Sequence, residues 1–302
     1  MTPLLRKSET TAGRPPAAVE LSSEGALAAA IPTPGEAPVY AFAPLAANAL
    51  IPGIADPNIR DAQKVSDAIR AALDYVSPRT RSVSLILPDI AVRVFMLDFD
   101  TLPTRAAEAI PVLRFRLRKM VPFDVEHAAV SYQILSQSKS EMKVLTAVLP
   151  GPILAEYEAA VRDAGYEPGA VLPSSLASLE AIDSMEAVLA ANLSPYALTT
   201  SITTGSDLLL HRTLDLPENP ALRFSEIQRG IAVAAAYFED KLQAPARVLH
   251  YAGSYETDDF ARWLDTPGLT VVDLAPRPLT GLATRLGTAS IAGATGALVG
   301  AR

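Results

Sequence analysis

Apolar and polar positions along the chain follow two patterns, short runs typical of strands and longer stretches with helical spacing. The strand-like runs are bounded by Gly, Pro or Ser and lie at 17–21, 26–31, 39–42, 82–88, 92–99, 129–135, 142–150, 168–173, 196–202, 206–216, 246–253 and 269–274. The helical stretches lie at 58–76, 104–121, 152–165, 174–191, 219–243, 257–264 and 286–301. Strand hairpins lead into helices in both halves, which predicts an α/β protein with a domain break near 192–195.

The helix predicted from residue 104 illustrates the local signals. Ile110, Leu113, Leu117 and Val121 would share one face, which would be buried. A proline at 111 removes one backbone hydrogen bond inside the helix and predicts a kink there. A second proline at 122 predicts the end of the helix, because the residue before a proline avoids helical angles.

Composition narrows the class of protein. The 302 residues are 49% hydrophobic and 20% charged, long enough for two domains that each bury a core. The formal net charge of −7 argues against a general attraction to nucleic acid or to acidic lipid. With no cysteine and three widely separated histidines, disulfides, thiolate nucleophiles and Cys/His metal sites are not expected. Residues 1–16 lack the apolar core of a signal peptide and predict a disordered lead. No apolar run reaches the ~20 residues of a membrane span, so we expect a cytoplasmic protein.

Three stretches, at 82–103, 107–135 and 145–179, resemble the PilM family of type IV pilus assembly proteins in order and spacing. The first carries paired strands that end in Leu102-Pro103. The second carries a helix that ends in Val121-Pro122-Phe123 and is followed by a strand reading SYQIL. The third carries a strand, a helix and a second strand that leads into a Ser-rich helix start. Together these stretches cover roughly residues 80 to 180.

The resemblance implies an actin-like (ribonuclease H-like) fold of two domains around a nucleotide cleft, related to the cell-division protein FtsA. It divides the chain into a first domain at 17–193, with an inserted FtsA-type subdomain at about 80–170, and a second domain at 194–302. The hairpins near Val19 and Ile202 would carry the two phosphate loops, and the turn at 249–254 would carry the adenosine loop.

All three expected nucleotide loops depart from the actin-like pattern, in which an Asp-x-Gly turn approaches the phosphates and helps to hold Mg²⁺. In the first loop Glu20 stands at the Asp position, and Ser22 replaces the glycine. In the second, Ser201 and Thr203 take the Asp and Gly positions, and the adenosine turn contains only Gly253. The sequence therefore predicts a degenerate site without catalysis and no cofactor. The alternative is that ATP and Mg²⁺ still bind, held by Glu20, Thr203, Thr204, Gly205, Ser206 and Gly253.

The basic segment at 113–135 allows three interpretations: a solvated face, a nucleic-acid patch, or a docking surface for another protein. The net charge and the shortage of aromatic residues argue against nucleic acid. Members of the PilM family bind the cytoplasmic N-terminal tail of the inner-membrane protein PilN. An extended peptide could dock here through main-chain hydrogen bonds and side-chain pockets, and Arg114, Arg118 and Phe123 are the predicted contacts.

The resulting hypothesis is a cytoplasmic scaffold of the type IV pilus inner-membrane platform, peripheral to the membrane through its partners and with a pilus motor ATPase as a further candidate partner. One alternative is an actin-like ATPase whose nucleotide state gates partner binding. Another is the cytoplasmic module of a type II secretion platform, although no membrane span follows in this chain. Other enzyme classes lack support, because the sequence has no Gly-x-Ser-x-Gly motif, no Walker loop and no His–Glu pair at metal spacing.

Overall fold

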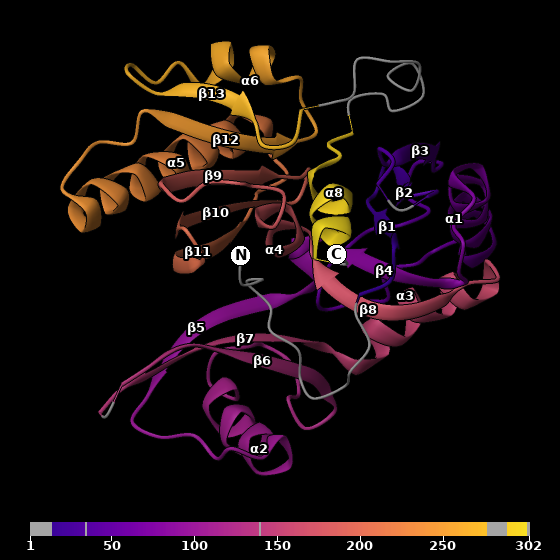
Figure 1. The fold of residues 1–302 in the computed structure, drawn as a ribbon, viewed down its shortest axis with the longest axis horizontal. Helices are drawn as coiled ribbons and strands as arrows, with labels where there is room; N and C mark the ends of the chain where they lie inside the picture. The colour runs from indigo at the N-terminus through magenta and orange to yellow at the C-terminus, as the bar shows by residue number, and fades with distance from the viewer. Residues whose placement is uncertain (1–13, 34, 139, 277–288, 301–302) are drawn as a thin grey trace.

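Three β-sheets organise the computed structural model, which describes residues 14–33, 35–138, 140–276 and 289–300 (Figure 1). Most of the predicted lead, residues 1–13, lies outside the described residues. Its last residues, 14–16, pack against the folded domain. Arg14 forms an ion pair with Glu180 at 2.9 Å, and the carbonyl of Pro16 accepts a hydrogen bond from the amide of Ile31 at 3.4 Å.

The first sheet has five strands in the order β3-β2-β1-β4-β8. The strands β1, β2 and β3 form an antiparallel meander, and β4 and β8 continue the sheet in parallel with β1. Ala17 and Val19 of β1 pack with α1 and α3, whereas Ala18 packs with α4 and α8 on the opposite face. The elements are β1 (Ala17–Leu21), β2 (Gly25–Ala30), β3 (Val39–Pro44), β4 (Ser82–Leu87), β8 (Glu167–Pro173), α1 (Ala62–Val76), α3 (Gly151–Asp163), α4 (Ser174–Leu179) and α8 (Ala292–Val299).

The second sheet repeats the same plan, with strands in the order β11-β10-β9-β12-β13. The strands β9, β10 and β11 form an antiparallel meander, and β12 and β13 continue the sheet in parallel with β9. The helices α5 and α6 cover one face, where Ile227 and Phe260 are 1% exposed. The elements are β9 (Ala187–Leu193), β10 (Ala197–Thr204), β11 (Asp207–Asp215), β12 (Val248–Gly253), β13 (Thr270–Asp273), α5 (Pro220–Leu242) and α6 (Thr257–Leu264).

A small three-stranded sheet, in the order β5-β7-β6, lies beside the two larger ones. The helix α2 packs on it through Leu113 and Leu117, both 0% exposed as the helical spacing predicted, and forms the lower end of the molecule in Figure 1. This subdomain is smaller than the predicted range of 80–170, because β4 and β8 belong to the first sheet and α3 packs on that sheet. Its elements are β5 (Arg93–Phe99), α2 (Ala106–Leu117), β6 (Ala128–Gln137) and β7 (Met142–Pro150), and the short helix η1 (Asp89–Ala91) precedes it.

The helix predicted at 174–191 is wrong in its second half. The helix α4 ends at Leu179, and β9 begins at Ala187 as the central strand of the second sheet. Val188 and Ala191 are 4% and 0% exposed, so this strand is buried against elements on both sides. Tertiary packing overrides the helix propensity of its alanines and leucines. The two large sheets therefore divide the chain before β9, and not after residue 193.

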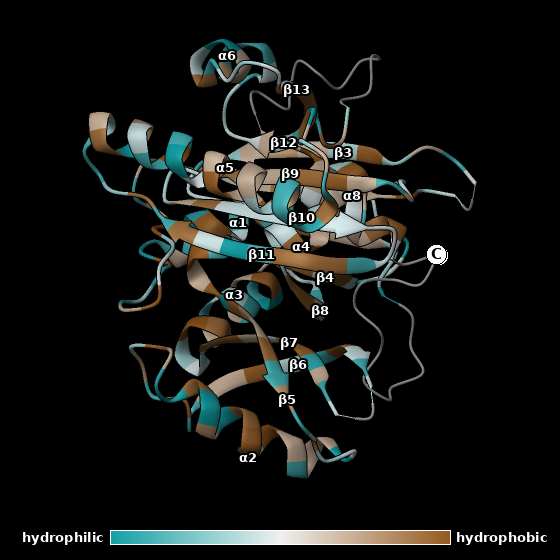
Figure 2. Cartoon of the chain, turned by 90° about the vertical axis from the view of Figure 1, so that its left-hand side faces the viewer, coloured by the Kyte–Doolittle hydropathy of each residue, from teal (hydrophilic) through white to brown (hydrophobic). Residues whose placement is uncertain are grey.

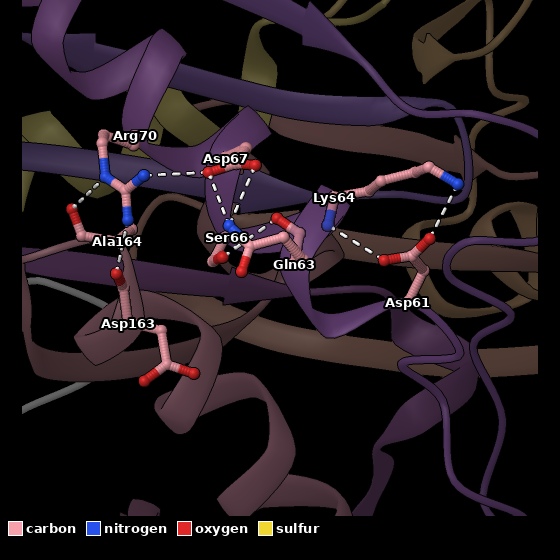
Figure 3. A network of polar contacts seen from close by, with 8 residues as sticks. All are labelled: Asp61, Gln63, Lys64, Ser66, Asp67, Arg70, Asp163 and Ala164. Carbon is pink, nitrogen blue, oxygen red and sulfur yellow. Dashed lines mark hydrogen bonds and ion pairs between the residues drawn. The ribbon is translucent and has the colours of Figure 1, made fainter.

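Polar caps fix the ends of the outer helices (Figure 3). Asp61 caps α1 by accepting a hydrogen bond from the amide of Lys64 at 3.1 Å. Arg70 of α1 donates to the carbonyls of Asp163 and Ala164, which end α3, at 2.7 and 3.4 Å. These bonds satisfy carbonyls that the helix itself leaves open, and they hold α1 and α3 side by side. No helix among the described residues is long and apolar enough to cross a membrane.

Candidate functional site

The carboxyl ends of β1, β4, β9 and β12 meet at one cleft between the two large sheets, the usual place for a ligand in an open α/β sheet. The cleft contains a cavity of about 80 Å³. Its lining consists of Glu20, Leu21, Ser22, Glu24, Leu27, Phe42, Pro88, Asp89, Ser174, Asn192, Leu193, Ser194, Pro195, Gly253, Ser254, Ala289 and Ser290. Of the predicted nucleotide residues, Glu20 and Gly253 are therefore at the cleft.

In the turn between β1 and β2, a side chain of the turn accepts hydrogen bonds from the backbone amides of the same turn. The hydroxyl of Ser22 accepts hydrogen bonds from the amides of Glu24 and Gly25, both at 3.2 Å. The backbone of Ser22 also pairs with Gly25, at 2.9 and 3.3 Å. In a phosphate loop such amides would point at the anion. Here a side chain of the turn takes them instead.

The second turn at the cleft joins β9 to β10. The sequence had placed the second phosphate loop one hairpin later, near Ile202. Thr203, Thr204, Gly205 and Ser206 form the hairpin between β10 and β11, and Thr204 pairs with Ala187 at the start of β9. They therefore lie at the opposite end of the second sheet and do not line the cleft. The error follows from the missed strand β9, because without it the next hairpin along the chain takes its place.

The turn after β9 repeats the chemistry of the first. The hydroxyl of Ser194 accepts hydrogen bonds from the amides of Tyr196 and Ala197 at 3.3 and 3.0 Å. The amide of Ser194 donates to the carbonyl of Ala197 at 2.9 Å. Asn192 stands two residues before this serine, as Glu20 stands two residues before Ser22. The two turns thus occupy equivalent places in the two sheets, and both are closed by a serine.

Glu20 points from β1 toward the N-terminus of α8. Its Oε1 accepts a hydrogen bond from the hydroxyl of Ser174 at 2.5 Å, and its Oε2 is buried at the start of α8, where the backbone of Ala294 favours the charged form of the carboxyl. A Cβ on Gly293 would lie 2.5 Å from this Oε2, so the carboxyl needs glycine there. Burial raises the pKa of Glu20 to about 7; the bond from Ser174 opposes that rise, and the nearby Asp89 adds to it.

Asp89 joins the two halves of the molecule. Its Oδ1 accepts hydrogen bonds from the amide and the hydroxyl of Ser175 at 2.9 and 2.8 Å. Its Oδ2 accepts from Asn192 at 3.2 Å and from Thr199 at 3.0 Å, both in the second sheet. Asn192 also donates to Ser174 at 3.0 Å, which links this network to Glu20. Burial raises the pKa of Asp89, although these hydrogen bonds favour its charged form.

The charge of the cleft does not suit a nucleoside triphosphate. Three carboxyl groups and no lysine or arginine occur among the described residues that line it. The carboxyl oxygens of Asp89 are engaged by four donors, and Glu20 is held by Ser174. The charge and the engaged donors of this described lining do not fit Mg-ATP.

The turn at the expected adenosine loop is filled by the protein itself. Tyr251 is 2% exposed and stacks on Phe260 with ring centroids 4.1 Å apart. Its hydroxyl accepts a hydrogen bond from the amide of Tyr255 at 3.3 Å. The amide of Ser254 donates to the carbonyl of Leu193 at 3.3 Å, which fixes this turn against β9. Tyr251 is therefore a core residue and does not offer its ring to a base.

The three predicted partner contacts lie together in the small subdomain, at the end of α2 and in the turn that follows. Arg114 donates to the carbonyl of Ala128 at 2.9 Å and so joins α2 to β6. Arg118 is 61% exposed and forms an ion pair with Glu126 at 2.5 Å. Phe123 is half-buried against the core of the subdomain. Their role in binding a partner stays a prediction.

Sequence reasoning missed Asp89, Ser174 and Asn192, which build the polar network of the cleft. Two of them had a recognisable signal. Asp89 is the second residue after the buried strand β4, and Asn192 is the last residue but one of β9, so both stand at carboxyl ends of strands. Ser174 had no such signal, because its contact with Glu20 joins residues 154 positions apart.

Comparison with solved structures shows the same overall fold in other proteins. A chain of the PilM–PilN type IV pilus biogenesis complex matches with a TM-score of 0.72 and 17% identity, over 95% of this chain and 98% of that one. The cytoplasmic domain of EpsL, an inner-membrane component of the type II secretion system of Vibrio cholerae, matches with a TM-score of 0.50 and 15% identity, over 89% and 91%. A protein of unknown function with an actin-like ATPase fold from Bacteroides thetaiotaomicron matches with 0.50 and 11%, over 86% and 91%.

No protein-family model and no curated protein matches the sequence. The structural matches establish the fold, and they confirm the predicted PilM-like, actin-like architecture. At these identities they leave the activity to be argued from the residues.

Proposed function

We propose that this chain is a scaffold component of a type IV pilus assembly platform and that it holds a partner protein instead of turning over ATP. The observation that carries the proposal is the match to the PilM–PilN complex over nearly the whole length of both chains. The partner would be a PilN-type inner-membrane protein, bound by its cytoplasmic N-terminal tail. The chain would then lie on the cytoplasmic side of the inner membrane, attached through that partner, with a motor ATPase as a further candidate contact.

The cleft supports a pseudo-ATPase. Ligand pockets usually measure about 300–1,000 Å³, and this cavity measures about 80 Å³. A nucleotide would enter a cleft whose two sides are already joined by the contacts of Asp89 with Asn192 and Thr199. It would also bring its negative charge among three carboxyl groups. Each of these terms opposes binding, and in the two serine turns the amides of Glu24, Gly25, Tyr196 and Ala197 already donate to a serine hydroxyl.

A titration with Mg-ATP tests this part of the proposal. A ligand present at about 100 times its Kd would add about 2.7 kcal/mol of apparent stability. We expect no change in melting temperature and no heat of binding with millimolar Mg-ATP. A saturable heat together with a rise in melting temperature would support the alternative, in which nucleotide state gates partner binding.

A titration with a fluorescent peptide that copies a PilN-type N-terminal tail tests the partner. The charge reversal Arg118→Glu should weaken binding at least several-fold, because a cation on the subdomain surface can form charge-assisted hydrogen bonds with the peptide. The double variant Arg118→Glu/Glu126→Arg restores the ion pair within the protein but leaves the positive charge at position 126. If it has the stability of the wild type and still binds the peptide weakly, the loss of binding does not come from a loss of stability. Arg105→Glu, at the far end of α2 and 83% exposed, is the matched control. An unchanged Kd for Arg118→Glu would remove this residue from the binding surface.

The likeness to the EpsL cytoplasmic domain supports a second candidate, a module of a type II secretion platform. The two candidates differ in their partners. Affinity purification of the full chain from solubilised membranes, with mass spectrometry of the proteins that copurify, should recover a PilN-type protein under the first. Recovery of secretion-platform components instead would favour the second.

A further inference from the structure

A second cavity, of about 140 Å³, lies between α5 and the strands β10 and β11, which face the viewer in Figure 2. Its walls are mainly apolar, and two arginines are among the residues that line it. The lining consists of Leu198, Thr200, Leu210, Arg212, Leu214, Arg229, Gly230, Val233, Ala234 and Tyr237. We call it the α5 groove.

Small residues of α5 create the α5 groove. A Cβ on Gly230 would lie 2.7 Å from Cδ2 of Leu198, so glycine is what lets the helix come close while a space remains beside it. On the other side, Leu210 and Leu214 of the edge strand β11 are only half-buried. Val233 is 43% exposed at the opening. An apolar depression of this kind leaves surface in water that a matching group would bury.

The α5 groove lies on the far side of the second sheet from the cleft. Alternate residues of a strand point to opposite faces. Thr199 contacts Asp89 on the cleft side, and its neighbours Leu198 and Thr200 line the α5 groove. A molecule bound in the α5 groove would therefore lie on the face of the second sheet that points away from the cleft.

The charge at the groove is positive although the chain carries a net charge of −7. The side chain of Arg212 is exposed, and its guanidinium forms no ion pair or hydrogen bond within the part of the chain that the structure describes. Arg229 is 55% exposed and pairs with Glu226. An uncommitted guanidinium beside an apolar cavity favours a ligand in which a carboxylate stands next to an apolar group.

The size of the cavity fits a single side chain. A cavity of about 150 Å³ holds one benzene molecule, and the α5 groove measures about 140 Å³. A leucine or phenylalanine side chain would fill it. Nucleic acid offers the negative charge without the apolar anchor, and a lipid surface meets flat basic faces better than an enclosed depression.

We propose that the α5 groove docks a segment of a partner protein that presents a leucine or phenylalanine next to an acidic residue. The apolar side chain fills the space beside Gly230, and the carboxylate binds Arg212. Buried anchor residues of this kind contribute most of the energy of an interface. With the small subdomain as the first docking surface, the chain would connect two partners through opposite parts of its structure.

Peptide selection on the full chain tests the proposal directly. Twelve-residue peptides displayed on phage are selected on the wild-type protein and counter-selected on Val233→Trp, in which the exposed position 233 fills the opening. We expect enriched peptides that pair Leu or Phe with Asp or Glu. The synthetic form of the best one should lose at least tenfold in affinity on Val233→Trp and on Arg212→Glu. The same charge reversal at the exposed Arg247, which does not line the α5 groove, should leave affinity unchanged.

Several outcomes would overturn the proposal. Peptides that bind Val233→Trp as well as wild type, or no enrichment over the counter-selection, would show that the α5 groove holds no such segment. Dimerisation in sedimentation experiments that Val233→Trp abolishes would assign it to a second copy of this chain. Binding to anionic vesicles that Arg212→Glu abolishes would assign it to lipid. If Val233→Trp does not fold, Arg212→Glu carries the comparison alone, because its side chain is exposed.

Discussion

The buried carboxyl of Glu20 makes the stability of this protein depend on pH near neutrality. Burial raises its pKa from 4.5 to about 7, so in this window the folded chain holds a proton that the unfolded chain has released. The contribution of Glu20 to the free energy of unfolding is fully present below pH 4.5, falls as the pH rises toward 7, and is lost above that pH. The substitution Glu20→Gln removes the titration, while its amide oxygen can still accept a hydrogen bond from Ser174.

The size of the effect follows from the two pKa values. One pKa unit corresponds to about 1.36 kcal/mol. Between about pH 5 and pH 8, a shift of this size changes the free energy of unfolding by about 2.5 kcal/mol. The stability of Glu20→Gln relative to wild type should therefore increase by about that amount over this range. Asp89 titrates in both proteins, so its own contribution largely cancels in the comparison.

Urea unfolding of both proteins at several pH values measures the difference. Circular dichroism is the suitable probe because Trp263, the single tryptophan, reports only on the second domain. The control is Glu36→Gln, which removes the same charge from an exposed loop and should give a nearly constant difference. A difference for Glu20→Gln that does not change with pH would refute the reasoning, since it would mean that the carboxyl is solvated in the folded state.

Three further substitutions test other parts of the structure by chemical denaturation. Thr199→Val removes a hydrogen-bond donor to the carboxylate of Asp89 and should lower the free energy of unfolding by about 1.5–3 kcal/mol. Thr213→Val loses only the hydrogen bond to Thr199 and should lower it by about 0.5–1.5 kcal/mol. Equal losses for the two variants would contradict the role of Asp89. Leu113→Ala should cost about 2–5 kcal/mol and speed hydrogen exchange in β5 to β7, because Leu113 is fully buried under α2. Tyr157→Phe should cost about 1 kcal/mol, since it loses one buried hydrogen bond to Asn58, and no loss would show that the bond contributes nothing.

Local signals in the sequence were sufficient for most elements, and they failed where packing decides. The helix predicted at 219–243 is α5, and Asn219 caps its start through bonds that reach only the next few residues. The strand β9 could not be predicted in this way, since its alanines and leucines suit a helix as well as a central strand. Only its pairing with β10 and β12 makes it a strand, and those contacts come from distant parts of the chain.

That one missed strand also moved the candidate site. A phosphate loop is defined by its place between the first two strands of a sheet, so an error in counting strands transfers the loop to the wrong hairpin. Glu20 and Gly253 do line the cleft, because the strands β1 and β12 that carry them are recognisable in the sequence. Ser174 and Asn192 come together only in the folded chain, and no spacing rule connects them with Glu20.

The two serine turns support the proposal that this actin-like fold functions without a nucleotide. A cradle for phosphate needs backbone amides that have no other acceptor. In this chain Ser22 and Ser194 supply that acceptor from within the turn, at equivalent positions of the two sheets. Asp89 then supplies the contact between the two sheets that a bound ligand would otherwise provide. The amides of Glu24, Gly25, Tyr196 and Ala197 and the contact between the two sheets are therefore satisfied within the chain, which is why we propose that the outer surfaces of this protein, and not a nucleotide in the cleft, carry its function.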